Sequence, residues 1–238
     1  MCTVTFTPTN SSYIFTSSRD EKYTRNKIEF PTYQEVGGHS ILFPRDCEAK
    51  GTWIAISVHR TVCLLNGAFV YHESTPPYRK SRGLMVLESF QFDTIKSFVE
   101  EYDFSGIEPF TFIMIDNSKQ EGLNELRWDG EKVHHARLSM EEKCIWSSAT
   151  LYTKEAQLNR EEWFSNWHQK HATNLQNCRA FHYDAGKESK DNSVLLKREE
   201  KGTVSITSVV PSKEGVKLII DDFTETREAV LSNEVQAI

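Results

Sequence analysis

Two segments near the N-terminus, Met1-Cys2-Thr3-Val4-Thr5-Phe6 and Ser18-Arg19-Asp20-Glu21, organise the predicted structure. In the first stretch apolar residues alternate with threonines, and this period of two is typical of a β-strand. Residues 8–12 have turn composition, and residues 13–17 form a second predicted strand. The two strands predict a hairpin that returns residues 18–21 to the start of the chain, beside Cys2.

The chemistry of an N-terminal cysteine makes Cys2 a candidate nucleophile. Removal of Met1 would leave Cys2 with a free α-amine, whose ordinary pKa of about 7.7–8.0 lies close to the thiol value of about 8.5. The amine can then take the thiol proton, directly or through a water, without a histidine. A neighbouring Arg19 would favour the thiolate, and Asp20 would orient the ammonium form. The alternative is that Cys2 is incidental and that Arg19 and Asp20 form a surface ion pair.

Length and composition are those of one ordinary globular domain. The chain has 238 residues, of which 38% are hydrophobic and 26% are charged. We therefore expect a single domain over residues 1–238, with the polar residues 224–238 as a frayed tail. The net charge of -6 argues against general binding to nucleic acids or membrane surfaces, because their phosphates require an excess of lysine and arginine.

The cysteines and the hydropathy pattern predict a soluble cytoplasmic protein. None of the five cysteines forms a Cys-x-x-Cys pair, so neither a structural zinc site nor a disulfide framework is expected. Residues 1–18 lack the basic and apolar regions of a signal peptide. No stretch approaches the roughly 20 apolar residues of a membrane span. The sequence carries no signal for a particular oligomeric state.

The rest of the chain predicts β-hairpins, with the helices gathered in the middle. Periodicity and turn signals predict strands at residues 51–57, 61–66, 109–116, 124–128, 132–137, 143–147, 192–198, 203–210 and 216–220. Two short helices are expected from Ser81 onward, broken near Phe92, and a further helix begins with Asn159 as its N-cap. Residues 24–50 contain prolines and glycines and show little periodicity, so we expect them to be mostly irregular. The pattern indicates an α+β domain of stacked sheets covered by helices.

Several motifs, in the same order, resemble the NRDE family, also called the transport and Golgi organisation protein 2 family. Ser18-Arg19-Asp20-Glu21 resembles the Asn-Arg-Asp-Glu motif for which the family is named. The further matches are Pro44-Arg45-Asp46 with Gly51-Thr52-Trp53, Leu64-Leu65-Asn66, Ser81-Arg82-Gly83, Ile145-Trp146-Ser147-Ser148-Ala149 and Lys190-Asp191-Asn192-Ser193. The resemblance covers residues 1–210.

This resemblance implies an N-terminal-nucleophile hydrolase-like fold, a four-layer αββα sandwich of two mainly antiparallel sheets. In cysteine amidases of that fold the N-terminal cysteine attacks an amide, an arginine and an aspartate organise it, and asparagines help to form the oxyanion hole. The corresponding positions of this sequence are Cys2, Arg19, Asp20, Asn66, Ser148 and Asn192. Asn66 ends a predicted buried strand and would be an oxyanion donor, although it fits a simple Asn-Gly turn equally well.

The chain departs from the family pattern at three positions. Ser18 replaces the first asparagine of the named motif, Lys50 replaces a glycine, and Ser148 replaces an asparagine. A serine hydroxyl can still donate a hydrogen bond, but its reach is shorter than that of an asparagine.

Two functions follow from the residues and the resemblance. The first is a cysteine amidohydrolase that cleaves the C–N bond of a small non-peptide amide without a cofactor. The second is a non-catalytic protein that binds or carries an apolar ligand such as haem, an acyl-coenzyme A or a lipid, because family members are linked to haem handling, lipid metabolism and Golgi organisation.

The histidines and tryptophans outside these motifs give no metal site. His134-His135 is a strand pair whose side chains point to opposite faces. His168 and His171 lie one helical turn apart without a third ligand or a Glu-x-x-His pattern. Trp163 and Trp167 are expected to pack in the core or beside a groove, and an apolar groove for a flat ligand stays open as an alternative.

Overall fold

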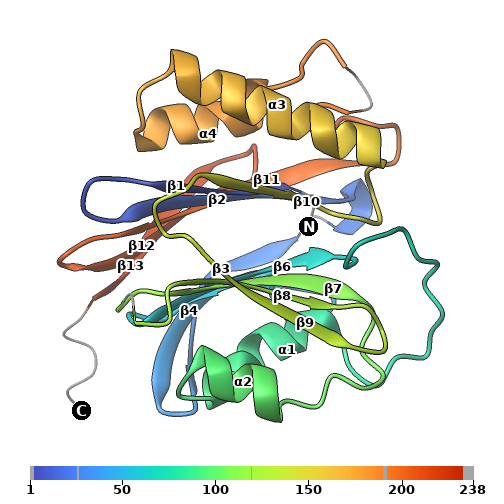
Figure 1. Ribbon diagram of the computed structural model, residues 1–238, viewed down its shortest axis with the longest axis vertical. Helices are drawn as coiled ribbons and strands as arrows, with labels where there is room; N and C mark the ends of the chain where they lie inside the picture. Colours follow the sequence, from blue (N-terminus) through green and yellow to red (C-terminus); the bar gives the residue numbers. More distant parts are fainter. Residues whose placement is uncertain (1–2, 26, 119, 190–191, 233–238) are drawn as a thin grey trace.

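Two antiparallel β-sheets lie face to face, and one pair of α-helices covers the outer face of each sheet (Figure 1). This computed structural model describes residues 3–25, 27–118, 120–189 and 192–232. The four layers, helix, sheet, sheet and helix, confirm the α+β sandwich expected from the sequence.

The first sheet contains the predicted N-terminal hairpin at its centre. Its strand order is β10-β1-β2-β11-β12-β13. The strands are β1 (Thr3–Pro8), β2 (Tyr13–Lys22), β10 (Cys144–Ser147), β11 (Lys201–Pro211), β12 (Gly215–Asp221) and β13 (Thr226–Ser232). The second sheet has the order β3-β4-β5-β6-β7-β8-β9. Its strands are β3 (Ile28–Val36), β4 (His39–Asp46), β5 (Ile54–Ile56), β6 (Arg60–Asn66), β7 (Phe110–Asp116), β8 (Leu123–Trp128) and β9 (Val133–Leu138).

The helices begin at side-chain caps and cover the outer faces. α1 (Arg82–Glu88) is capped by Ser81, and α2 (Ile95–Glu101) by Thr94; with the short η2 (Ser89–Gln91) they cover the second sheet. α3 (Lys154–Lys170) and α4 (Leu175–Asp184) cover the first sheet (Figure 1). A hydroxyl that accepts from the first turn of a helix satisfies a backbone donor that would otherwise lack a partner.

The alternation in β1 separates two different layers of the protein. Val4 and Phe6 belong to the apolar core between the sheets, together with Phe15 and Trp146. The threonines of β1 point the other way, toward α3 and α4, and are buried although they are polar. That layer is therefore held by hydrogen bonds as well as by apolar contacts.

Residues 24–50 are not irregular, and this expectation is wrong. After the short η1 (Tyr23–Arg25) they form the β3–β4 hairpin, which turns at Gly37 and Gly38 with φ values of +57° and +81°. Pro31 lies in β3, which is the edge strand of its sheet, where a missing N–H interrupts no ladder on the open side. The exposed face of β3 carries polar residues, so apolar periodicity is weak there.

Three further boundaries differ from the expectations. Residues 192–198 form no strand and contribute a single bridge from Lys197 to Gly202. Residues 226–232 form β13, which pairs with β12, so that part of the predicted tail is ordered; residues 233–238 lie outside the described part of the chain. α3 begins five residues before Asn159 because Thr153 caps it, and α4 was not predicted.

Candidate active site

The strand register brings the start of the described chain next to Arg19. Thr3 pairs with Ser18 across the β1–β2 hairpin, and Val4 pairs with Ser17. The hairpin predicted from the sequence is therefore confirmed with the expected direction. Cys2, the predicted nucleophile, lies outside the described residues.

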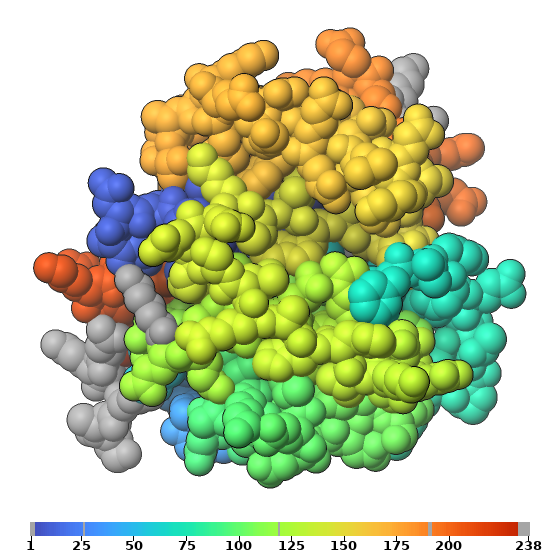
Figure 2. All heavy atoms as spheres, viewed as in Figure 1, coloured from blue at the N-terminus to red at the C-terminus, as the bar shows by residue number. Residues whose placement is uncertain are grey.

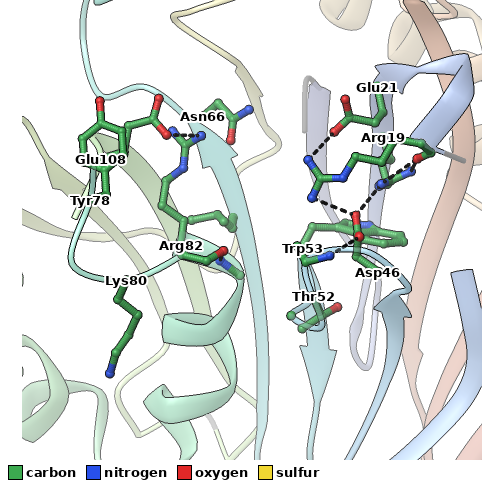
Figure 3. A pocket seen from close by; sticks show the side chains of 16 residues that line it. Arg19, Glu21, Asp46, Thr52, Trp53, Asn66, Tyr78, Lys80, Arg82 and Glu108 are labelled. Carbon is green, nitrogen blue, oxygen red and sulfur yellow. Dashed lines mark hydrogen bonds and ion pairs between the residues drawn. The ribbon is translucent and has the colours of Figure 1, made fainter. Parts of the chain in front are cut away.

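A cleft of about 350 Å³ lies at this end of the molecule, where the ends of β2, β4 and β6 meet the start of α1. One wall carries Arg19 and Asp46, and the facing wall carries Arg82 and Glu108, with Asn66 at the end of β6 between them (Figure 3). The long segment from β6 to α1, residues 67–81, supplies part of the rim and projects from the surface of the molecule (Figure 2).

Arg19 is a buried cation on the wall formed by the first sheet. Its side chain donates to Asp46 Oδ2 at 2.7 Å and to the carbonyl of Arg25 at 3.1 and 3.2 Å, and it lies 4.8 Å from the ring centre of Trp53. Burial alone would raise the pKa of Asp46, but the amide of Ala49 together with Arg25 and Arg19 outweighs it and holds that pKa below its ordinary value. Asp46 is therefore an anion that fixes the position of Arg19.

Asp20 points away from Arg19, because neighbouring residues on a strand face opposite sides. Its two carboxylate oxygens accept hydrogen bonds from Tyr152 at 2.5 Å and from Thr203 at 2.6 Å in the layer below α3. Arg19 and Asp20 are 4% and 6% exposed, so the alternative of a surface ion pair is wrong. The role of Asp20 toward Cys2 stays a prediction.

Asn66 and Ser148 meet at the end of β6. The Ser148 hydroxyl is buried and donates to the backbone carbonyl of Asn66 at 2.8 Å, and it also contacts Thr150 Oγ1 at 3.1 Å. Within the described chain no residue forms a hydrogen bond with the Asn66 carboxamide, which lines the cleft. Asn66 thus offers a free donor, while Ser148 holds the backbone that carries it. Gly67 follows with φ +79°, so Asn66 is both a turn residue and a cleft residue.

Asn192 lies on the helical side of the first sheet and does not line the cleft. Its backbone carbonyl accepts from Arg160 Nε at 3.1 Å. Arg160, in α3, is fully buried; it also donates to Thr3 Oγ1 at 2.6 Å and to the carbonyl of Ser193 at 2.5 Å, and its guanidinium lies 3.4 Å from the ring centre of Tyr152. Sequence reasoning missed Arg160, because a lone arginine among polar helix residues gives no signal of burial.

Two motifs that are 30 residues apart in the sequence touch each other at the cleft. The Thr52 amide donates to the Gly83 carbonyl at 3.1 Å, and a Cβ on Gly51 would lie 2.5–2.9 Å from the Gly83 backbone. Only glycine allows this approach. The contact places Trp53 and Arg82 on the cleft walls and gives a physical reason for the two glycines.

His182 stands at the centre of the polar layer between β1, β2 and α4. It is fully buried and forms hydrogen bonds with Thr5 Oγ1 at 2.9 Å and Ser18 Oγ at 2.8 Å. Burial, with smaller contributions from Arg179 and Arg160, lowers its pKa from 6.5 to about 3. The hydroxyl of Ser18, which replaces an asparagine of the family motif, therefore forms a hydrogen bond with His182.

His182 is expected to make the protein less stable in acid. The folded protein keeps this imidazole neutral, so its contribution is complete above pH 6.5 and is lost as the pH falls toward 3. The loss is about 1.4 kcal/mol per pH unit in that window. Urea unfolding from pH 7 to 4 measures this loss. The slope of the unfolding free energy against pH should be shallower for His182→Gln, by the contribution of about one proton. Parallel declines in the two proteins would contradict this assignment.

Three other histidines, His134, His135 and His171, and the tryptophan Trp167 contact neighbouring side chains. His134 contacts Asp129 and His135 contacts Asn124, which confirms that their side chains diverge. Trp167 stacks on His171 with ring centres 4.0 Å apart.

Among residues 3–25, 27–118, 120–189 and 192–232, no group of three or more His, Cys, Asp or Glu is arranged to hold a metal ion. In those same ranges, no helix has the length and apolarity needed to cross a membrane.

The fold of this chain is shared with solved structures of other proteins. Its structural neighbours have the N-terminal-nucleophile hydrolase-like fold. Two variants of conjugated bile acid hydrolase from Clostridium perfringens match with TM-scores of 0.55 and 0.56, at 12% and 11% identity, over 97% of this chain and 92% of theirs. Penicillin V acylase from Agrobacterium tumefaciens matches with a TM-score of 0.54 at 12% identity, over 98% of this chain and 89% of its own.

The sequence family is identified independently of these structures. The model of the family Transport and Golgi organisation 2 matches residues 1–201, and the chain belongs to that family. This confirms the resemblance seen in the motifs. Comparison with curated proteins gives no significant match.

Proposed function

We propose that this protein is a cysteine N-terminal-nucleophile amidohydrolase that cleaves the C–N bond of a small non-peptide amide. The observation that carries the proposal is the pairing of Thr3 with Ser18, beside the cleft lined by Arg19. Cys2 is covalently bonded to Thr3, and its thiol is therefore the proposed nucleophile of this cleft. The alternation of Val4 and Phe6 predicts that a side chain at position 2 faces the second sheet, as Arg19 does.

In the proposed reaction, removal of Met1 frees the α-amine of Cys2 to act as the base. The amine takes the thiol proton as Sγ attacks the amide carbonyl carbon, and a C–S bond forms. When the tetrahedral intermediate collapses, the C–N bond breaks and the ammonium returns the proton to the leaving amine. Water, deprotonated by the same amine, then attacks the thioester carbonyl and forms a C–O bond. The C–S bond breaks, the ammonium returns its proton to Sγ, and a carboxylic acid is released.

Arg19 and Asn66 have different roles in this scheme. The Arg19 cation would favour the thiolate of Cys2, and Asp46 holds it in place. Asn66 would donate to the oxyanion of the intermediate, because its carboxamide faces the cleft with no bond to a described residue. The cleft walls are rich in charged side chains, which suits a polar amide better than an apolar ligand such as haem.

Replacing Cys2 tests the proposal. Cys2→Ala is expected to reduce hydrolysis of hexanoyl-p-nitroanilide by about 10³-fold or more, because the nucleophile is lost. Cys47→Ala is the matched control and should keep the full rate, because Cys47 lies outside the cleft lining. Release of p-nitroaniline reports both rates. A Cys2→Ala protein that hydrolyses the anilide at the original rate would contradict the proposal.

A further inference from the structure

Among the described residues, every cationic side chain that lines the cleft forms an ion pair with a carboxylate. The cationic side chains that line it are Arg19, Arg25, Lys80 and Arg82. On the wall that carries Arg19, Asp46 at the end of β4 lies 2.7 Å from Arg19 and 3.2 Å from Arg25, and Arg25 also lies 3.5 Å from Glu21. These contacts form one continuous cluster (Figure 3). An anion entering beside it would meet the carboxylates as well as the arginines.

On the facing wall, the described cations are also paired with carboxylates. Arg82 Nη2 lies 2.9 Å from Glu108 Oε2, and Nη1 donates to the carbonyl of Pro109 at 2.9 Å. Both partners of this ion pair are largely shielded, with side chains 16% and 18% exposed. Lys80 donates to both carboxylate oxygens of Glu88 at 2.6 Å. Arg82 would be the natural anchor for a ligand carboxylate, and Glu108 already occupies that role.

An uncharged group is still needed to hold a ligand, and Asn66 is such a group. Its carboxamide is a donor and an acceptor, and no described residue uses it. A neutral amide can exchange hydrogen bonds with Asn66 without breaking an ion pair. A carboxylate placed in the same cleft would lie near Glu21, Asp46 and Glu108 in a setting where like charges are costly.

We propose that the cleft selects electrically neutral ligands, and that Glu108 sets this selectivity by neutralising Arg82. This inference rests on the proposed function in that the ligand is then the amide substrate, and it narrows that substrate to uncharged amides. Glu108 acts as a specificity-determining residue and takes no part in bond cleavage.

A matched pair of alkylating reagents tests the proposal without a known substrate. Iodoacetamide is neutral and iodoacetate is anionic, and both transfer their carbon to a thiolate with loss of iodide. A reporter thiol introduced by Asn66→Cys, in a Cys2→Ala background, lies in the cleft and does not depend on where Cys2 lies. Peptide mass mapping gives the ratio of the iodoacetamide rate to the iodoacetate rate at position 66. This ratio is normalised to the same ratio for 2-mercaptoethanol.

The expected result is a normalised preference for iodoacetamide of about tenfold. Adding Glu108→Gln should reduce that preference about tenfold, because Arg82 then attracts iodoacetate. Glu228→Gln is the matched control, because Glu228 pairs with Lys217 on β12, away from the cleft, and the preference should stay unchanged.

The outcomes separate this inference from the proposed function. No preference in the Asn66→Cys protein, or an equal preference after Glu108→Gln, would overturn charge selection by the cleft. A different result would contradict the amidohydrolase proposal alone. In that result, position 66 shows the expected preference and its loss in Glu108→Gln, while Cys2 of the original protein reacts with neither reagent.

Discussion

Arg160→Met is expected to lower the free energy of unfolding by about 3 kcal/mol. The substitution keeps the aliphatic part of the side chain. It removes the guanidinium N–H groups that donate to Thr3 Oγ1 and to the carbonyls of Asn192 and Ser193. Those acceptors are in a buried layer where water cannot replace the lost hydrogen bonds. Equilibrium unfolding in urea measures the effect.

Arg179→Met is the matched control for this prediction. Arg179 lies in α4, is only partly buried, and bonds with Ser208 and Tyr183 at 3.1 and 3.2 Å. Its loss should cost less than about 1 kcal/mol. Equal losses in the two variants would show that the Arg160 network has no special part in fixing the start of β1.

Asn66→Ala is expected to lower kcat for hexanoyl-p-nitroanilide by about 10²–10³-fold and to leave stability unchanged. Stability should be unchanged because the carboxamide forms no hydrogen bond with a described residue, and because Ser148 still holds the backbone at position 66. KM should change little, because an oxyanion donor acts in the transition state and not on the bound substrate. Steady-state kinetics and urea unfolding together check the prediction.

Asn192→Ala provides the control for Asn66. Both asparagines are sequence candidates, but Asn192 contributes a backbone carbonyl on the helical side of the first sheet. Its substitution should leave kcat within about twofold, since side-chain changes away from the reacting atoms have small effects. A loss of kcat in Asn192→Ala as large as in Asn66→Ala would mean that the oxyanion donor was assigned to the wrong wall.

The sequence predicted those parts of the fold in which local pattern and tertiary structure agree. The alternation of Val4 and Phe6 gave the first strand, because one face of β1 packs into the apolar core between the sheets. Asn66 was named as a candidate because Leu64-Leu65-Asn66 resembles a family motif and because it ends a predicted buried strand. In such cases a short window of sequence already contains the physical cause.

Other features could not be predicted because their causes lie far away in the chain. β3 is an exposed edge strand with little apolar pattern, and its partner β4 decides its structure. Glu108 and Arg160 are ordinary charged residues in the sequence, and their roles come from contacts with Arg82 and Thr3. Asp20 was expected to accompany Arg19, and strand geometry turned it to the opposite face.

Peptide mapping after reaction with a chloroacetamide-bearing amide tests whether Cys2 is the nucleophile. We expect the N-terminal peptide to begin at Cys2, without Met1, and to be labelled much faster than peptides containing Cys47, Cys63, Cys144 or Cys178. Burial raises the pKa of Cys63 to about 12, so that thiol should react least. A retained Met1, or label on the other cysteines with Cys2 unmodified, would contradict the assignment of Cys2 as the nucleophile.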